Sequence, residues 1–533
     1  MKEKRPVKHP KAKARQTQDS VPKKNERSKA VKPKSSDGQK KWVKDKNSTS
    51  NDGQSTRKSA IKNTDKNNAK RIEKNADRSK VNNAETSADQ GVQKRSKAYS
   101  ERTNERKRYK DKGSRSDQGK RREQGAARIS RPVTMVKAIK VTQTYADYVV
   151  TPPCPIFETC GGCQLQMFND EGQLKYKYSQ LIDLLGKFGK VEPIEGMREP
   201  FHYRHKTHAT FSYSKGRPRR IIAGIFEEHS HRVVETENCL IQDERANNII
   251  QSILALMPSF KMIPYDEDAE KGFLRHALIR TAFAHDGVMV VLVGGSPIFP
   301  AKRRFTEALI KKHPEIKTVI FNINSRKTSM VLGNREEVLY GSGYLEDSLC
   351  GMTFRISPKA FYQVNPEQTE KLYREAIKMA GLTGGERVLD AYAGIGTIGM
   401  VASTGAKEVI SVELNKDAVR DAIRSARDND VKNIYFHQAD ATEFIEQMAA
   451  TGEKADIVFL DPPRSGSTPA FIKAVAKMKT DRVVYVSCNP ETLARDLALF
   501  KSEGYKIVRI KPFDMFPWTG HVETVVRLQR QNP

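Results

Sequence analysis

The sequence predicts an α/β protein in three parts: a disordered basic tail, a mixed α/β central domain, and a carboxyl-terminal domain with a doubly wound, mainly parallel sheet. Two observations support this prediction. Residues 1–130 contain 40 Lys and Arg against 16 Asp and Glu, with no Leu and no Phe. Beyond residue 380, short β-branched runs alternate with helical patterns, which is typical of βαβ units.

The tail is expected to cover residues 1–133. A segment without large apolar side chains cannot bury enough surface to offset the entropy of ordering. Residues 1–130 carry a net charge of +24, most of the chain's +30, and such a segment can bind RNA, bind an acidic membrane surface or aid solubility; we favour RNA. No apolar run approaches the roughly 20 residues of a membrane span, and no signal-peptide core opens the chain. We therefore expect a cytoplasmic protein without a membrane partner.

The central domain is expected to cover residues 134–350. Its sequence alternates between strand-like and helix-like patterns. The expected strands are 136–141, 221–226, 278–283, 288–293 and 318–323, and the expected helices are 171–189 and 301–312. His202, His205 and His208 are spaced by three, which on strands scatters them over both faces and argues against a metal site.

Three of the six cysteines form a C-x5-C-x2-C array at Cys154, Cys160 and Cys163. Gly161-Gly162 lets the backbone wrap tightly between two ligands. Cys239 is the candidate for a fourth ligand. Clustered cysteines in a long cytosolic chain point to a metal or to catalysis before disulfides. Four thiolates suit either a [4Fe–4S] cluster or a structural zinc, and the array alone does not choose between them.

The carboxyl-terminal domain, residues 351–533, opens with a segment that contains Gln363 and with a helix expected at 367–380. Six strands should follow, with helices between them, around Val388, Val409, Ile434, Ile457, Val483 and Ile507. This alternation predicts the doubly wound sheet. Ligands of such sheets bind at the carboxyl ends of the strands, so the residues that directly follow strands are the candidates for a site.

A glycine turn, Gly394-Ile395-Gly396, follows the first of these strands, where bare backbone can approach a ligand closely. Glu413 ends the next strand, where a carboxylate can accept both ribose hydroxyls of a cofactor. Gly399 completes a G-x-G-x-x-G pattern, so the glycines alone leave NAD open. Asp390 before the turn and Asp461-Pro462-Pro463 after the fourth strand fit S-adenosylmethionine better.

Cys488 follows the β-branched run 482–487, at the end of an expected parallel strand where α/β enzymes place their chemistry. A buried structural role is the commoner fate of a lone cysteine. The neighbouring motifs favour catalysis. They are Val388–Thr397, Val409–Glu413, Ile457–Arg464 and His521–Glu523, and together with Cys488 they resemble the RNA (uracil-5-)-methyltransferases.

The resemblance implies a Rossmann-like methyltransferase domain that binds S-adenosylmethionine. The residues that would line this cofactor are Gln363, Tyr392, Thr397, Glu413, Asp440 and Asp461. Thr397 and Asp440 stand where some members have an amide. Members that act on 23S ribosomal RNA carry a [4Fe–4S] cluster with this cysteine spacing, and the related tRNA enzyme lacks it. The resemblance thus implies a cluster held by Cys154, Cys160, Cys163 and Cys239, and 23S ribosomal RNA as the substrate.

The family's larger members usually open with a small RNA-binding β-barrel. It is missing here, and the basic tail occupies its place in the sequence. The resemblance also implies that the central domain presents basic residues such as Arg204 and Lys206 to RNA. Either charge could equally be solvated surface. We expect a monomer.

Uracil C5 is too weakly nucleophilic to attack a methyl sulfonium unaided. A thiolate that adds at C6 makes the ring an enolate with negative charge available at C5, and Cys488 is the expected nucleophile. After methylation the C5 proton must leave, and the family motif assigns that base to Glu523, with His521 as the alternative. The uridine must be splayed out of its stack to react. Phe513, Phe516 and Trp518 could shape its pocket or pack the core.

Other readings remain open. Amine methyltransferases end a similar Asp-Pro-Pro motif in an aromatic residue, where this chain has Arg464, and RNA cytosine-5 enzymes place a Pro-Cys nucleophile at that strand. Methylation of a tRNA uridine to 5-methyluridine is the alternative within the family, disfavoured by the cysteine array. A non-catalytic RNA-binding factor for ribosome assembly is the alternative outside it, disfavoured by Cys488, Glu523 and Asp461.

Overall fold

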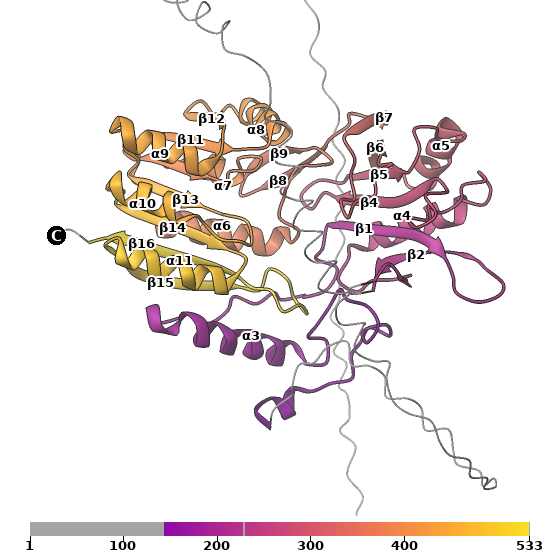
Figure 1. Ribbon diagram of the computed structural model, residues 1–533, viewed down its shortest axis with the longest axis horizontal. Coiled ribbons are helices and arrows are strands. Elements are labelled where there is room, and N and C mark those ends of the chain that lie inside the picture. The colour runs from indigo at the N-terminus through magenta and orange to yellow at the C-terminus, as the bar shows by residue number, and fades with distance from the viewer. Residues whose placement is uncertain (1–142, 228–229, 532–533) are drawn as a thin grey trace, which may run out of the picture. The chain divides into compact units, whose positions relative to one another are not determined.

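The structure, a computed structural model, describes residues 143–227 and 230–531. The expected tail and the expected strand 136–141 lie outside these residues. Within the described ranges, no helix combines the length and the apolar character that crossing a membrane requires. The first described element is the short 3₁₀ helix η1 (Gln143–Tyr148), and the described chain folds around two large sheets (Figure 1).

The first sheet has seven strands in the order β3-β2-β1-β4-β5-β6-β7. Their bounds are β1 Lys206–Tyr213, β2 Ile221–Phe226, β3 Val233–Glu235, β4 Leu274–Thr281, β5 Val288–Gly294, β6 Ile316–Ile323 and β7 Arg335–Gly341. Only β5 and β6 pair in parallel. The strands expected at 221–226, 278–283, 288–293 and 318–323 are confirmed as β2, β4, β5 and β6.

Two helices, α4 (Glu244–Leu256) and α5 (Lys302–Lys312), pack their apolar side chains on this sheet. Ile249 and Ile253 of α4 share a buried cluster with Phe305 and Leu309 of α5. The Asp243 side chain begins α4 by accepting the Arg245 amide. The helix expected at 301–312 is therefore confirmed, and the region is mixed α/β as predicted.

The second sheet has the order β12-β11-β10-β13-β14-β16-β15. Its strands are β10 Arg387–Ala391, β11 Glu408–Glu413, β12 Ile434–Gln438, β13 Ile457–Leu460, β14 Arg482–Ser487, β15 Tyr505–Phe513 and β16 Glu523–Arg530. The first five are parallel, and β16 lies antiparallel between β14 and β15. All six expected strands are confirmed. The seventh, β16, had been recognised only as a short motif.

Helices cover both faces of this sheet, which confirms the doubly wound prediction (Figure 1). One face packs on α6 (Pro366–Ala380), α7 (Thr397–Ser403) and α8 (Lys416–Asp428), and the other on α9 (Ala441–Thr451), α10 (Pro469–Lys477) and α11 (Pro490–Ser502). Successive residues of β10 alternate between the two cores: Val388 joins the first and Leu389 the second.

Helix α3 (Asp170–Leu185) packs on the second sheet although it precedes the first one in sequence. Its Leu181 and Leu185 are buried among residues of α11 and β15. The expected helix 171–189 ends earlier than predicted, because residues from Gly186 to Phe188 form the 3₁₀ turn η2. Val191 then bridges β15 in parallel, so this segment extends the sheet at its edge.

A hairpin of β8 (Leu345–Leu349) and β9 (Met352–Ile356) lies across the expected boundary between residues 350 and 351. Asp347 of β8 accepts backbone N–H groups of Phe283 and Ala284, beside the first sheet. Thr353 of β9 donates its amide to Asn429, at the end of α8. The hairpin thus joins both sheets of the described chain within one compact unit. The division into 134–350 and 351–533 stays a prediction.

Candidate active site

The predicted site residues follow the carboxyl ends of four parallel strands. Tyr392 comes after β10, Glu413 ends β11, Asp461 follows β13 and Cys488 follows β14. Because the strands are parallel, these ends meet at one edge of the sheet. The four side chains line one cavity of about 490 Å³. The cavity is also lined by Gln363, Thr397 and Glu523.

Asp440 is the one predicted cofactor residue outside this lining. Its side chain caps α9 by accepting the amides of Thr442 at 2.8 Å and Glu443 at 3.2 Å. That capping role accounts for an acidic residue at this position without a cofactor. A cofactor contact of Asp440 remains a prediction.

The glycine turn lets α7 approach the sheet closely. Gly396 has φ +77°, a left-handed conformation, and a Cβ there would stand 2.7 Å from the Phe436 ring. A Cβ on Gly399 would stand 2.5 Å from the Ser411 hydroxyl, and the Gly399 amide donates to Asp390 at 2.9 Å. The third glycine therefore serves helix packing. The backbone of residues 393–395 faces the cavity.

Glu413 is held at the turn by two backbone amides. Its Oε2 accepts from Gly394 at 2.9 Å and its Oε1 accepts from Asn415 at 2.7 Å. Each carboxylate oxygen retains a further lone pair, so the group can still accept ribose hydroxyls.

The part of the cavity around Asp461 is acidic. Burial, with a contribution from Asp390, raises the pKa of Asp461 to about 7. Among the described residues, the Asp461 carboxylate has no hydrogen bond and no ion pair. Buried carboxylates without a cation fit a cofactor that brings positive charge, as the sulfonium and the amino group of S-adenosylmethionine do. The residues present therefore fit this cofactor.

Strand register places the expected nucleophile beside the expected base. Ser487 of β14 pairs with Thr524 of β16, so Cys488 and Glu523 are the next residues at this end of the pair. Burial, reinforced by the Glu523 and Asp461 carboxylates, raises the pKa of the Cys488 thiol to about 11. The Arg464 guanidinium opposes this rise. The thiol of the free enzyme is thus protonated near neutral pH.

Glu523 is the expected base, and its carboxyl group must be deprotonated before it can act. The residue is only 2 % exposed, and its Oε2 has no hydrogen-bond partner among the described residues. Burial, reinforced by Asp461 and opposed by Arg464, raises the pKa of Glu523 well above its ordinary value. A buried carboxylate of this kind is a stronger base than an exposed one.

His521 lines the same cavity, but its contact with Arg464 makes it a weaker candidate for the base. Arg464 Nη2 lies 3.2 Å from His521 Nε2. A guanidinium can only donate, so Nε2 accepts and its lone pair is occupied. Burial, and then the Arg464 charge, lowers the pKa of His521. The geometry therefore favours Glu523 over His521.

The three aromatic candidates have different surroundings. Phe516 lines the catalytic cavity. Phe513 lies in the core of the second sheet. Trp518 packs with the cysteine-rich segment, stacks on Phe201 with ring centroids 5.2 Å apart, and donates its indole N–H to the Pro200 carbonyl. Core packing is thus the observed role of Phe513 and Trp518.

A buried ion pair that sequence reasoning missed supports the loop that carries Phe516. Lys177 of α3 lies 2.5 Å from Asp514, and both side chains are at most 1 % exposed. Lys177 also donates to the Phe516 carbonyl, and Gln173 donates to Asp514 at 2.6 Å. Burial lowers the pKa of Lys177, and Asp514 opposes that change. A single Lys in an amphipathic helix gave no signal of this contact with a loop 337 residues away.

The four predicted metal ligands line a second cavity of about 480 Å³. They are Cys154, Cys160, Cys163 and Cys239. Burial raises the pKa of Cys239, and its cysteine neighbours add to the rise. Two sulfurs accept hydrogen bonds. The backbone amide of Gly162 donates to Cys160 at 3.4 Å, and the side-chain amide of Gln166 donates to Cys163 at 3.3 Å.

In the described part of the chain, no three His, Cys, Asp or Glu side chains are arranged to hold a metal ion. Each thiolate of a four-iron cluster binds its own iron, so its ligands stand farther apart than those of one ion. Four cysteines at one cavity, with hydrogen bonds to sulfur, are a donor set that fits such a cluster. The cluster itself remains a prediction.

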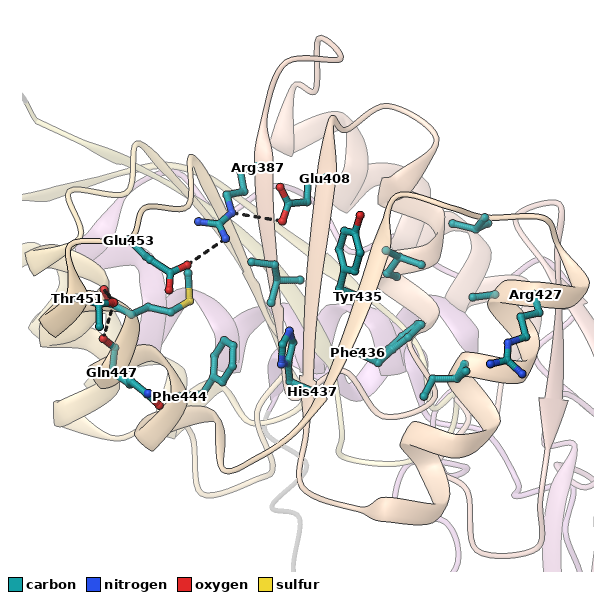
Figure 2. A pocket seen from close by; sticks show the side chains of 16 residues that line it. Arg387, Glu408, Arg427, Tyr435, Phe436, His437, Phe444, Gln447, Thr451 and Glu453 are labelled. Carbon is teal, nitrogen blue, oxygen red and sulfur yellow. Dashed lines mark hydrogen bonds and ion pairs between the residues drawn. The ribbon is translucent and has the colours of Figure 1, made fainter. Parts of the chain in front are cut away.

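A further cavity, of about 600 Å³, lies along the edge strand β12 of the second sheet (Figure 2). Arg387 lies there 3.6 Å from Glu408 and 3.0 Å from Glu453. None of the predicted site residues lines it. Volume alone therefore does not locate the chemistry, which depends on the strand ends.

The doubly wound sheet, and a cavity at its strand ends whose residues fit S-adenosylmethionine, are features of Rossmann-like methyltransferases that depend on this cofactor. Residues 169–531 match the tRNA (uracil-5-)-methyltransferase family, and the chain belongs to this family. It is thus an RNA uracil-5-methyltransferase that uses S-adenosylmethionine.

Curated relatives agree with this assignment. The chain is 41% identical over 388 residues to an uncharacterized RNA methyltransferase of Halalkalibacterium halodurans, covering 72% of this chain and 84% of the relative. A second such protein, from Caldanaerobacter subterraneus, is 42% identical over 389 residues, with 72% and 85% covered.

Among solved structures, the chain is similar to the tRNA (uracil-54, C5)-methyltransferase of Pyrococcus abyssi, a complex with S-adenosyl-L-homocysteine. The TM-score is 0.58 and the identity 27%, with 69% of this chain and 86% of that chain covered.

Proposed function

We propose that this enzyme methylates C5 of a uridine in 23S ribosomal RNA through a covalent bond between Cys488 and C6 of the uracil. The observation that carries the proposal is the register of β14 and β16, which places Cys488 beside the unpartnered Glu523 oxygen in one cavity with Asp461. A nucleophile and a base that act on adjacent ring carbons must lie this close together.

The cofactor would be held by residues that follow different strands of the sheet. When bound, S-adenosylmethionine supplies a methyl group on a positively charged sulfur. Glu413 would accept the ribose hydroxyls, while Gln363, Tyr392 and Thr397 line the walls. Asp461 would face the positive charge. Cys488 lines the same cavity, which would bring the target carbon close to the transferred methyl.

The Cys488 thiol must ionise before it can add to C6. Its pKa of about 11 in the free protein is too high for a reactive thiolate near pH 7. Positive charge lowers this pKa, and Arg464 already acts in that direction. We therefore propose that cofactor binding, which adds a second positive charge, promotes ionisation. The ribose-bearing uracil then accepts the sulfur at C6 and becomes an enolate.

Glu523 completes the reaction. The enolate takes the methyl at C5, which becomes tetrahedral and holds both the methyl and a proton. Glu523 removes that proton through the oxygen that has no partner. The electron pair left by the proton restores the C5–C6 double bond and expels the Cys488 thiolate. The products are 5-methyluridine, S-adenosyl-L-homocysteine and the enzyme with the abstracted proton on Glu523.

The four-cysteine cavity supports ribosomal RNA as the substrate, through the family resemblance. The Pyrococcus abyssi neighbour, whose name states a tRNA activity, makes tRNA the second candidate. The test offers the purified protein labelled cofactor with 23S RNA and with tRNA, both from cells that lack the protein, and maps 5-methyluridine. We expect label in 23S RNA at a defined uridine. Label in tRNA alone would contradict the assignment.

We further propose that the four cysteines hold a [4Fe–4S] cluster. Protein purified without oxygen should be brown and contain about four irons per chain. Replacement of Cys239 by Ser should lower the iron content and the thermal stability, whereas Cys350→Ser should change neither, because Cys350 lies outside the cavity. Stoichiometric zinc without iron would overturn this proposal.

A further inference from the structure

Three cavities of the described chain are neighbours, because each has lining residues in common with the next. The catalytic cavity and the four-cysteine cavity have Arg464, Phe516 and His521 in common. The four-cysteine cavity in turn shares Ile156 and Asn238 with an open groove of about 910 Å³. The four-cysteine cavity therefore lies next to the catalytic cavity on one side and next to this groove on the other.

The outer groove lies under the connection between β1 and β2. Figure 1 shows this connection, residues 214–220, as a loop that projects beyond both strands. Two hydrogen bonds close its base: the Ser214 amide donates to the Arg220 carbonyl at 2.8 Å, and the Arg220 amide donates to the Ser214 hydroxyl at 3.0 Å. We name this loop the basic hairpin. Its base is held by these two hydrogen bonds, and its exposed side chains lie beside the groove.

The charge of the groove favours an anionic strand. Four cations and two carboxylates line it: Lys215, Arg217, Arg220 and Arg232 against Glu235 and Glu237. Arg220 pairs with Glu235, and Arg232 pairs with Glu227. Among the described residues, Lys215 and Arg217 of this lining, and Arg219 next to it in the loop, have no ion pair, and all three are exposed. Three cations are left to meet phosphates.

The hairpin also offers a surface on which a base can stack. The Arg219 guanidinium lies 4.3 Å from the centre of the Tyr213 ring, and Tyr213 lines the groove. Aromatic rings and guanidinium planes are the usual platforms for unpaired bases in RNA. Arg204, on the wall of the four-cysteine cavity, adds a cation between this platform and Cys488.

We propose that the groove under the basic hairpin binds the single-stranded RNA that adjoins the target uridine on one side. The uridine enters the catalytic cavity, and the flanking strand runs past Arg464 and Arg204 to the hairpin. Lys215, Arg217 and Arg219 contact its phosphates, and Tyr213 with Arg219 stacks a base. This inference rests on the proposed RNA methylation, and it assigns affinity for the flanking strand to residues that take no part in the chemistry.

The test compares two triple variants of the full chain, purified without oxygen. One is Lys215→Ser/Arg217→Ser/Arg219→Ser. The control removes the same charge at Lys473, Lys477 and Lys501, which are exposed on α10 and α11 and line none of these cavities. Anisotropy measures the affinity for a labelled RNA fragment with the target uridine, and methyl transfer gives KM and kcat.

The hairpin variant should bind RNA at least about tenfold more weakly, with a KM raised in proportion. Its plot of log affinity against log salt should lose about 2 units of slope, since each single-strand phosphate contact contributes roughly 0.7. Its kcat and its affinity for the cofactor should not change. The control should stay within about twofold of the wild type. A hairpin variant that matches the control would overturn the inference. A wild type that methylates no RNA would instead defeat the proposed function.

A crosslink tests the path directly. A photoreactive benzoylphenylalanine replaces Tyr213, and RNA with 5-fluorouridine at the target position traps the enzyme covalently. Irradiation should link residue 213 to nucleotides on one side of the trapped uridine. Adduct formation shows that the variant folds and binds. An adduct that forms normally without any crosslink, or with crosslinks on both sides equally, would overturn the proposed path.

Discussion

Arg464 affects three ionisable side chains of the catalytic cavity. It opposes the rise in the pKa of Cys488 and of Glu523, and it occupies the Nε2 lone pair of His521. At this position the sequence showed only that an aromatic residue was absent after Asp-Pro-Pro. The effect of a charged residue depends on the groups that lie near it in the fold. The interactions of Arg464 therefore could not be predicted from the motif alone.

The two catalytic candidates should fail at different steps, because addition at C6 precedes proton removal at C5. Cys488→Ala should give neither a covalent RNA adduct nor product. Glu523→Gln should add and methylate, yet it lacks the base that permits elimination, so a protein–RNA complex containing the methyl should accumulate. Denaturing electrophoresis with labelled cofactor measures both. If Cys488→Ala forms an adduct, or Glu523→Gln turns over at the native rate, the assigned roles are wrong.

The rate of adduct formation should rise with pH, because Cys488 adds to C6 as the thiolate and the pKa of its thiol is raised. With saturating cofactor and 5-fluorouridine RNA, the rate should increase up to about tenfold per pH unit between about pH 6 and the pKa of the thiol in the complex. Arg464→Gln removes an opposing charge, so its profile should move to higher pH. Arg464→Lys keeps the charge and serves as the control. Superimposable profiles for both variants would contradict this account.

Elements with local patterns were predictable, and elements that depend on distant partners were not. Short β-branched runs predict the buried strands β10, β11 and β13. The strand β16 begins at Glu523, the proposed base, but its insertion between β14 and β15 depends on a non-local pairing that no local pattern shows. For the same reason Cys488 and Glu523 could be recognised only as separate motifs, because the register that brings them together is not visible in either one.

Helix α3 should matter to the active-site loop through one buried ion pair. Lys177→Met leaves the Asp514 carboxylate buried without its cation, which should lower the free energy of unfolding by about 3–5 kcal/mol. The loop with Phe516 should also lose its anchor, so the RNA KM should rise. Urea unfolding and steady-state kinetics measure the two effects.

The matched control for this prediction is the double variant Lys177→Met/Asp514→Leu, which removes both charges. It should recover much of the lost stability, because a buried pair replaced by apolar groups is often nearly neutral. If the single variant were as stable as the wild type, the pair could not be what holds the loop. Lys175→Met, at an exposed position of the same helix, should change little.

At the scale of the whole molecule, the types of element along the described chain were predictable, but which of them pack against one another was not. Helix α3 comes early in the sequence and packs on the last sheet, and the β8–β9 hairpin hydrogen-bonds to both sheets. Composition and periodicity assign a segment to a type of element, whereas its packing partner depends on surfaces that form only in the fold. The two sheets should therefore unfold together.

The tail prediction concerns the charge of the whole chain. Residues 1–130 hold +24 of its +30, and dispersed Lys and Arg raise RNA affinity by releasing counterions from phosphates without touching the reacting atoms. Deletion of residues 1–130 should therefore weaken RNA binding and flatten its salt dependence, while turnover at saturating RNA stays nearly intact. A chain that keeps the tail's length but carries Gln at its Lys and Arg positions should behave like the deletion, because charge rather than length is responsible. The basic hairpin variant acts at a fixed place and should lose the crosslink to the flanking strand, whereas the deletion should keep it. A large loss of saturated turnover on deletion would show instead that the tail takes part in the chemistry or in the folding of the catalytic unit.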